Sequence, residues 1–263
     1  MSSPLPAVLS FAASDPTGGA GLQADLLALA SLGCHPLSVV TAITAQDTRG
    51  VEAVMALEPA WIARQARLVL ADVRVAAFKI GVLGSAGNAE AVAAVLDEHP
   101  RIPVVLDPVL ASGRGDVLAD AEVLQGIRKR LLPRTTVLTP NSLEARRLAQ
   151  AGAEADLAQC AGDLIESGCK YVLVTGTHES SPEVVNRLFG ADGLVREDAW
   201  PRLPGEFHGS GCTLASAVAA FLAKGMALPA AVQAAQEYTW KSLRAAFSPG
   251  RGQQIPNRFF GAK

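Results

Sequence analysis

EFHGSGCTLASAVAAFLAKG, residues 206–225, joins a loop of small residues to a long apolar run. The run after Cys212 predicts a helix that ends at Gly225, with a lysine in its last turn. A glycine-rich loop that opens a helix directs backbone N–H groups outward, and the helix dipole adds partial positive charge there. Such a helix start binds anions, phosphate above all, and in this chain a cysteine stands at it.

Outward from this stretch, short apolar runs alternate with longer amphipathic ones. The runs that predict strands cover 7–14, 37–43, 75–83, 104–110, 136–140 and 171–176. Most have apolar residues on both sides of the strand alternation, which is typical of strands covered on both faces. The runs that predict helices cover 20–32, 59–70, 86–98, 121–131, 143–151, 157–167, 212–224 and 229–246, and a hairpin is predicted around 190–193. The alternation predicts one α/β domain over residues 1–263 with a mostly parallel sheet.

Composition and charge argue against several classes of protein. The 263 residues carry a formal net charge of −2 and no basic run, so we expect no nucleic-acid partner. The N-terminus lacks the features of a signal peptide, and no apolar run approaches the roughly 20 residues of a membrane span. The four cysteines form no CxxC pair and are expected to be free thiols. We therefore predict a soluble cytoplasmic protein with no membrane partner.

The polar residues that follow the strands are the candidates for a site, because ligands bind beyond the carboxyl ends of a parallel sheet. The segment SDPTGGAGLQADL, residues 14–26, has glycines that let the backbone approach a ligand, and Asp25 in the first turns of the next helix. The alternative is a plain glycine turn with an aspartate at a favourable helix start. The segment is neither a dinucleotide fingerprint nor a P-loop.

Three further strand ends carry polar side chains suited to small ligands. Gln46 has a planar amide that fits the edge of an aminopyrimidine, although it could equally be a solvated loop residue. Asp107 ends the fourth strand, and Asn141 and Glu144 follow the fifth. Their hard oxygen atoms suit Mg²⁺ held largely through water. Asn141 could instead simply cap the helix that carries Glu144.

Six segments occur in order: SDPTGGAGLQADL, VTAITAQDTRGV, KIGVLG, VVLDPV, LTPNSLEA and HGSGCTLASA. Together they resemble the hydroxymethylpyrimidine and hydroxymethylpyrimidine phosphate kinases of thiamine biosynthesis, in the ribokinase-like superfamily. The resemblance implies a three-layer α/β/α fold with a mostly parallel central sheet, and a homodimer. It also implies ATP- and Mg²⁺-dependent phosphorylation of 4-amino-5-hydroxymethyl-2-methylpyrimidine and then of its monophosphate.

The resemblance assigns roles residue by residue. The anion hole would consist of Gly209, Ser210, Gly211 and Cys212, with Cys212 at the catalytic position. The substrate would contact Gln46, Asp25, Gly19, Val82, Val109 and His208. The nucleotide would lie near Asp107, Asn141, Glu144, Thr175 and Gly176, and Mg²⁺ would be held by Asp107 and Glu144, mostly through water.

A cysteine in an anion hole needs a chemical explanation. A thiol at a helix N-terminus has a lowered pKa and can exist partly as thiolate, which would accept the proton of an alcohol. Phosphoryl transfer depends mostly on positioning and charge stabilisation, so a strong base is not required. A fixed aspartate would repel the second acceptor, which is already an anion. We therefore expect the Cys212 thiol to serve both acceptors; the alternative is a small buried residue that packs the helix start.

Two other functions stay open from the sequence. One is a pyridoxal kinase of the same superfamily, since some relatives with the cysteine motif accept both alcohols. The other is a nucleotide-binding regulator without turnover. Its support is Thr175, which stands where many members have a lysine near the nucleotide phosphates. A sugar kinase is disfavoured, because the aspartate of its Gly-x-Gly-Asp motif is replaced by Cys212.

Overall fold

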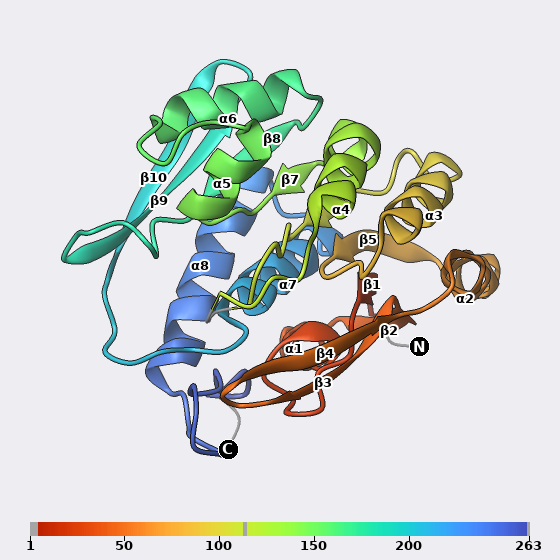
Figure 1. The fold of residues 1–263 in the computed structure, drawn as a ribbon, viewed down its shortest axis with the longest axis horizontal. Coiled ribbons are helices and arrows are strands. Elements are labelled where there is room, and N and C mark those ends of the chain that lie inside the picture. The colour runs from red at the N-terminus through yellow and green to blue at the C-terminus, as the bar shows by residue number, and fades with distance from the viewer. Residues whose placement is uncertain (1–4, 113–114, 262–263) are drawn as a thin grey trace.

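The computed structural model describes residues 5–112 and 115–261, and its centre is a sheet of eight strands (Figure 1). Residues 1–4, which belong to the N-terminus that was compared with a signal peptide, lie outside the described residues. The strand order is β10-β9-β8-β7-β6-β5-β1-β2, in which β9 runs antiparallel to both of its neighbours, β8 and β10, and all other neighbouring strands are parallel. The bounds are β1 (Ala7–Ala12), β2 (His35–Val40), β5 (Val75–Ile80), β6 (Val104–Leu106), β7 (Val137–Leu138), β8 (Tyr171–Val174), β9 (Glu183–Gly190) and β10 (Gly193–Pro201).

Helices cover both faces of the sheet, which confirms the predicted three-layer α/β/α fold. One face packs against α2 (Pro59–Asp72), α3 (Ala86–Asp97), α4 (Ala121–Gly126), α5 (Ser142–Ala149) and α6 (Leu157–Glu166). A π-helical turn, Ile127–Leu131, and a 3-10 turn, Leu132–Arg134, continue α4. The other face packs against α1 (Gly21–Ser31), α7 (Ser210–Ala223) and α8 (Leu228–Arg244). Within the described ranges, no helix has the length and apolar character needed to cross a membrane.

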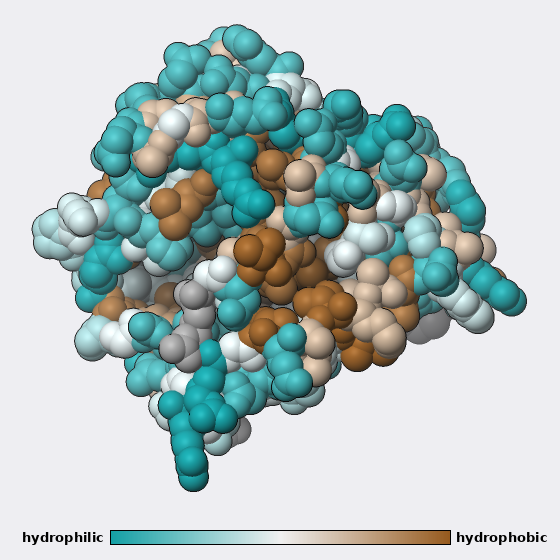
Figure 2. All heavy atoms as spheres, in the orientation of Figure 1, coloured by the Kyte–Doolittle hydropathy of each residue, from teal (hydrophilic) through white to brown (hydrophobic). Residues whose placement is uncertain are grey.

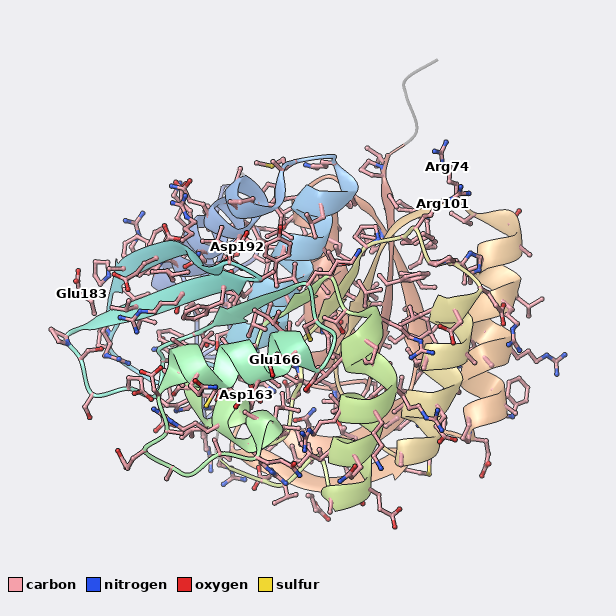
Figure 3. All side chains as sticks on the ribbon, turned by 90° about the horizontal axis from the view of Figure 1, so that it is seen from above. Arg74, Arg101, Asp163, Glu166, Glu183 and Asp192 are labelled. Carbon is pink, nitrogen blue, oxygen red and sulfur yellow. The ribbon has the colours of Figure 1, made fainter. Side chains whose placement is uncertain are left out.

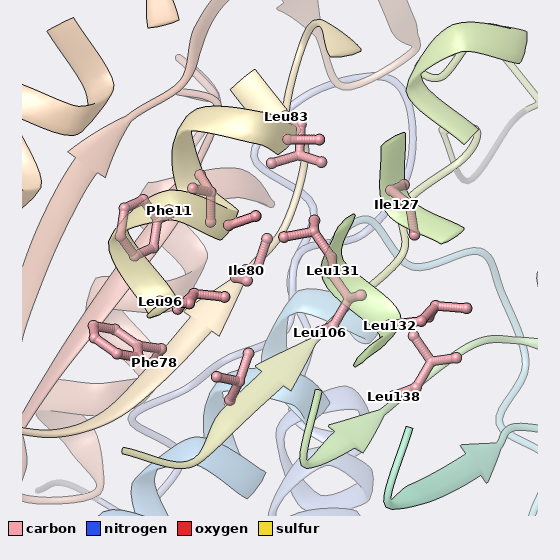
Figure 4. Packing of buried hydrophobic residues seen from close by; sticks show 14 of the residues in the cluster. Phe11, Phe78, Ile80, Leu83, Leu96, Leu106, Ile127, Leu131, Leu132 and Leu138 are labelled. Atoms are coloured by element: carbon pink, nitrogen blue, oxygen red, sulfur yellow. The ribbon is translucent and has the colours of Figure 1, made fainter. Parts of the chain in front are cut away.

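Side chains alternate between the two faces along each central strand. In β5, Phe78 and Ile80 pack on the α2–α6 side, whereas Ala77 packs on the side of α7. Complete burial of such a large apolar side chain contributes about 1.5–3 kcal/mol. Figure 4 shows strands and helices meeting on the first side through Phe11, Phe78, Ile80, Leu106, Leu131 and Leu138. Lys79 breaks the pattern, because it is fully buried on the α7 side of the same strand.

The helix predictions are confirmed to within two residues, except that the helix predicted over 121–131 divides into α4 and the π-helical turn. The predicted strand 37–43 is wrong at its end. The chain leaves the large sheet at Thr41 and forms a separate antiparallel hairpin of β3 (Ala42–Asp47) and β4 (Gly50–Ala56). A continuous apolar run conceals this break, which depends on tertiary contacts: the buried Thr41 hydroxyl donates to the Val82 carbonyl.

Candidate active site

A cleft of about 570 Å³ lies beyond the carboxyl ends of the parallel strands, a size suited to small ligands. Figure 2 shows this face of the molecule hollowed near its centre, with apolar residues gathered around the hollow. Arg74 and Arg101 precede β5 and β6 and so mark the opposite edge of the sheet (Figure 3). The predicted site residues that line the cleft are Gln46, Val82, Asp107, Val109, Asn141, Glu144, Thr175, His208, Gly209, Ser210, Gly211 and Cys212.

The start of α7 opens into the cleft and has the geometry of an anion site. Gly209 is its N-cap residue, with φ of +81°, and a Cβ there would lie 1.9 Å from the Gly19 carbonyl oxygen. Both the left-handed backbone and the close approach therefore require glycine. Among the described residues, no side chain caps this helix start. Its first N–H groups are consequently available to a bound anion.

Cys212 lies in the first turn of α7 with only 8% of its surface exposed. Burial raises the pKa of the thiol to about 12. Lys79 lowers this pKa, but the carboxylates of Asp107 and Asp25 raise it and so offset part of the effect of Lys79. The expectation of a lowered thiol pKa is therefore wrong. A helix start does favour thiolate, but here desolvation is larger than that effect. At neutral pH the Cys212 thiol is protonated.

Lys79, which the sequence analysis did not select, is the centre of a buried charged cluster. Its Nζ atom lies 2.9 Å from Asp25 Oδ1 and 3.9 Å from Asp107 Oδ2. Burial alone would lower the pKa of Lys79, but Asp25 and Asp107 hold it well above its usual value. The available signal was a lysine inside an otherwise apolar strand, since a buried charge needs a partner.

Asp25 belongs to this cluster and is absent from the cleft lining formed by the described residues. Its carboxylate is completely buried, and the Ser216 hydroxyl donates to it at 2.8 Å. The attraction of Lys79 explains this inward position. Contact between Asp25 and a substrate stays a prediction, and the structure places the side chain behind the cleft wall.

Asn141 and Glu144 form a capping box at the start of α5, as the simpler alternative for Asn141 predicts. Asn141 Oδ1 accepts from the Glu144 backbone N–H at 2.9 Å, and Glu144 Oε2 accepts from the Asn141 N–H at 3.0 Å. Glu144 Oε1 also accepts from the Leu110 N–H at 3.2 Å, which ties α5 to the segment after β6. Burial, together with the charge of Asp107, raises the pKa of Glu144 to about 8.

Asp107 carries negative charge at the cleft that Lys79 offsets only in part. Burial raises its pKa to about 6 although Lys79 lowers it, and Oδ2 has no hydrogen-bond partner in the described part of the chain. Such an oxygen suits a cation. No group of three or more His, Cys, Asp or Glu residues within 5–112 and 115–261 is placed to hold a metal ion. These donors therefore fit a hydrated Mg²⁺ and not an ion enclosed by protein ligands.

Gln46 lies on β3, one residue before the end of that strand, and not in the loop that the sequence suggested. Its amide donates to the Thr44 hydroxyl at 2.8 Å, and that hydroxyl donates to the Ser14 carbonyl at 2.7 Å. The half-buried amide is thus held from one side while it lines the cleft. Val82 and Val109 line the same cleft and supply apolar surface for a flat ring.

Two loops that are distant in sequence are joined beside the anion site. His208 Nε2 lies 2.9 Å from Asp15 Oδ2, and that carboxylate oxygen also accepts from the Ala20 N–H. A Cβ on Gly19 would lie 2.4 Å from the His208 ring, so only glycine fits there. Gly19 supports the position of His208 and is not itself part of the cleft lining.

The nucleotide side of the cleft departs from expectation at Gly176. Thr175 lines the cleft, whereas the Gly176 N–H donates to Asn186 Oδ1 at 3.1 Å and the residue faces a smaller cavity. Of the described lysines and arginines, Arg202 alone lines the cleft. Its guanidinium donates to the carbonyl oxygens of residues 177, 179 and 181 and organises that loop.

Comparison with known proteins agrees with this geometry. Residues 15–257 match the family model described as phosphomethylpyrimidine kinase. The hydroxymethylpyrimidine/phosphomethylpyrimidine kinase of Streptomyces coelicolor is 42% identical over 253 residues, covering 94% of this chain and 92% of that protein. The thiamine biosynthesis bifunctional protein of Geobacter sulfurreducens is 38% identical over 262 residues, covering 99% of this chain and 54% of that protein. An ADP complex of Bacillus subtilis pyridoxal kinase superposes with a TM-score of 0.88 at 27% identity, covering 97% of both chains. The chain belongs to the phosphomethylpyrimidine kinase family.

Proposed function

We propose that this kinase transfers the γ-phosphoryl group of ATP to 4-amino-5-hydroxymethyl-2-methylpyrimidine and then to the monophosphate, in thiamine biosynthesis. The observation that carries the proposal is one cleft that contains both the open helix start at Gly209 and the Gln46 amide. Helix-start N–H groups stabilise charge that develops on the transferring phosphoryl. The glutamine amide matches the acceptor and donor edge of an aminopyrimidine.

The reaction exchanges one P–O bond for another. The acceptor oxygen attacks the γ-phosphorus, the bond from the γ-phosphorus to the bridging oxygen breaks, and ADP leaves with that oxygen. In the first transfer the alcohol proton passes to solvent. The first N–H groups of α7 would hold the oxygens of the transferring group, and Gln46 would orient the ring. Bound Mg²⁺ would offset phosphate charge, and Asp107 and Glu144 are the residues that would hold it, largely through water.

The proposal extends to the domain organisation and the cellular compartment of the protein. We treat residues 1–263 as one kinase domain that works in the cytoplasm, and the four buried free cysteines suit a reducing compartment. The homodimer stays a prediction.

Pyridoxal phosphorylation is the second candidate function, favoured by the structural likeness to pyridoxal kinase. The test is ADP formation by the purified enzyme with the pyrimidine alcohol, its monophosphate or pyridoxal as acceptor. We expect the highest kcat/KM with the two pyrimidines. A preference for pyridoxal would overturn the proposed substrate, and no turnover with any of the three would favour a regulator.

Gln46→Ala should raise the KM for the pyrimidine and leave the KM for ATP nearly unchanged. The amide pairs with the ring, and its loss leaves a buried polar edge unmatched, at a cost of about 1–3 kcal/mol. Steady-state kinetics with each substrate varied in turn measures both constants. Gln159→Ala on the exposed face of α6 is the matched control. A raised ATP KM alone would place Gln46 on the nucleotide side.

Asp107→Asn and Glu144→Gln should each shift the Mg²⁺ dependence of turnover to higher concentration. Both substitutions keep the side-chain shape and remove a carboxyl group that can ionise beside a hard cation. The measurement is a Mg²⁺ titration at fixed ATP, with Asp163→Asn, at a half-buried residue of α6 outside the cleft lining, as control. Titration curves that coincide with wild type in both variants would mean that these carboxyls only cap and pack.

A further inference from the structure

The segment 247–258, which we name the C-terminal strap, connects two parts of the site through its backbone. The Gln253 N–H donates to the Thr48 carbonyl at 2.8 Å, at the tip of the β3–β4 hairpin. The Gln254 N–H donates to the Glu206 carbonyl at 2.9 Å, and the His208 N–H donates back to the Gln254 carbonyl at 2.8 Å. The strap therefore holds both the hairpin that carries Gln46 and the loop that leads into the anion site.

Arg258 ends the strap, and its side chain is 3% exposed. Its Nη1 atom donates to the Gly18 carbonyl at 3.4 Å, and Nη2 donates to the Gly19 carbonyl. Its Nε atom donates to the Thr213 hydroxyl at 3.1 Å, and that hydroxyl donates to the Gly209 carbonyl at 2.7 Å. One planar guanidinium thus joins the glycine turn after β1 to the first turn of α7.

The burial of the Arg258 guanidinium is not explained by a salt bridge. The structure records no ion pair for Arg258 with any described carboxylate, and its hydrogen-bond acceptors are two carbonyls and a hydroxyl. Burial of a charge without an ionic partner is costly, and apolar residues commonly serve stability as well or better. The rigid fork of donors is what an apolar side chain could not supply.

Arg258 joins the glycine turn after β1 to the start of α7. The distance between these two segments is important for phosphoryl transfer, because the start of α7 forms one wall of the cleft. Gly209 sits directly against Gly19, and His208 with Asp15 forms a second connection between the same segments. We propose that Arg258 is a positioning residue for phosphoryl transfer, which sets the glycine turn and the anion site at their working separation. The inference rests on the proposed function of the cleft. A displacement of about 1 Å in such a site can cost roughly 10²-fold in rate.

Arg258→Met should lower kcat by roughly 10²-fold on both acceptors while the KM values for ATP and pyrimidine change much less. Arg258→Lys should resemble Arg258→Met, because an ammonium group keeps the charge and loses the fork. Arg67→Met, which removes an exposed arginine paired with Glu98, is the matched control and should leave kcat unchanged. A wild-type kcat in Arg258→Met, or an effect confined to KM, would overturn the proposal.

Two measurements keep the test decisive if Arg258→Met folds poorly. Thr213→Val preserves side-chain size and removes the hydroxyl between Arg258 and Gly209, so kcat should fall while the protein stays folded. Guanidinium added at millimolar concentration should restore turnover to Arg258→Ala and not change that of Arg67→Ala. An unchanged kcat in Thr213→Val together with no guanidinium rescue would overturn the proposal. Wild-type turnover on the three acceptors tests the proposed function separately, and each variant is compared with wild type on the best acceptor.

Discussion

Lys79→Met is expected to lower the free energy of unfolding by about 3–5 kcal/mol and to abolish most turnover. The lysine is completely buried, and its Nζ atom lies 2.9 Å from Asp25 Oδ1 and 3.9 Å from Asp107 Oδ2. Methionine fills similar space but leaves two buried carboxylates without their cation. Urea denaturation followed by circular dichroism measures the stability, and ADP formation measures the turnover.

A double substitution separates charge from packing at this cluster. Lys79→Met combined with Asp25→Asn removes the cation and its closest anion together, so we expect part of the lost stability to return while turnover stays low. Lys241→Met is the control, because that lysine pairs with Glu237 on an exposed helix face and should change stability by about 0.5 kcal/mol or less. A Lys79→Met protein as stable as wild type would show that the buried pair is not a structural requirement.

Cys212→Asp is expected to slow transfer to the monophosphate by roughly 10²-fold or more, with a smaller effect on transfer to the alcohol. The new carboxylate would stand in the anion site, close to Asp107 and Asp25, and would repel an acceptor that is already charged. Like charges placed together in this way cost several kcal/mol. The alcohol carries no charge and would even gain a base. Each step is followed separately by supplying one acceptor at a time.

Two other substitutions of Cys212 show whether the loss of activity is caused by the added charge or by the missing thiol. Cys212→Asn has the shape of the aspartate variant without its charge, so it should slow the two steps to a similar degree. Cys212→Ala should also slow both steps alike, because a thiol with a pKa of about 12 is not a thiolate at neutral pH. Equal losses in the Asp and Asn variants would refute the electrostatic explanation. An alcohol step that falls alone by about 10²–10⁴-fold in Cys212→Ala would restore the general-base role.

Much of the architecture follows from local sequence pattern. The run at β1 is apolar except for Ser10 and is buried along its whole length, as expected of a strand covered on both faces. The glycines around residue 209 predict an open helix start because only glycine permits that backbone, and the structure has this geometry. Residue type and spacing also selected Gln46, Asp107 and Glu144, which line the cleft, and the family resemblance added further lining residues such as Val82 and Val109. These features depend on neighbours within a few positions along the chain.

The remaining features depend on segments brought together from far apart, so local pattern could not reveal them. Lys79 meets a carboxylate 54 positions away, and Arg258 meets a carbonyl 239 positions away. The hairpin that carries Gln46 separates from the large sheet through contacts of Thr41 with a distant turn. The protonation of Cys212 is decided by burial and by charges on other elements, which oppose the local effect of the helix start. The sequence by itself determined the alternation of strands and helices, the open helix start and the family resemblance. Only the tertiary structure decided the electrostatics, since desolvation and long-range charge pairing exist only after the chain has folded.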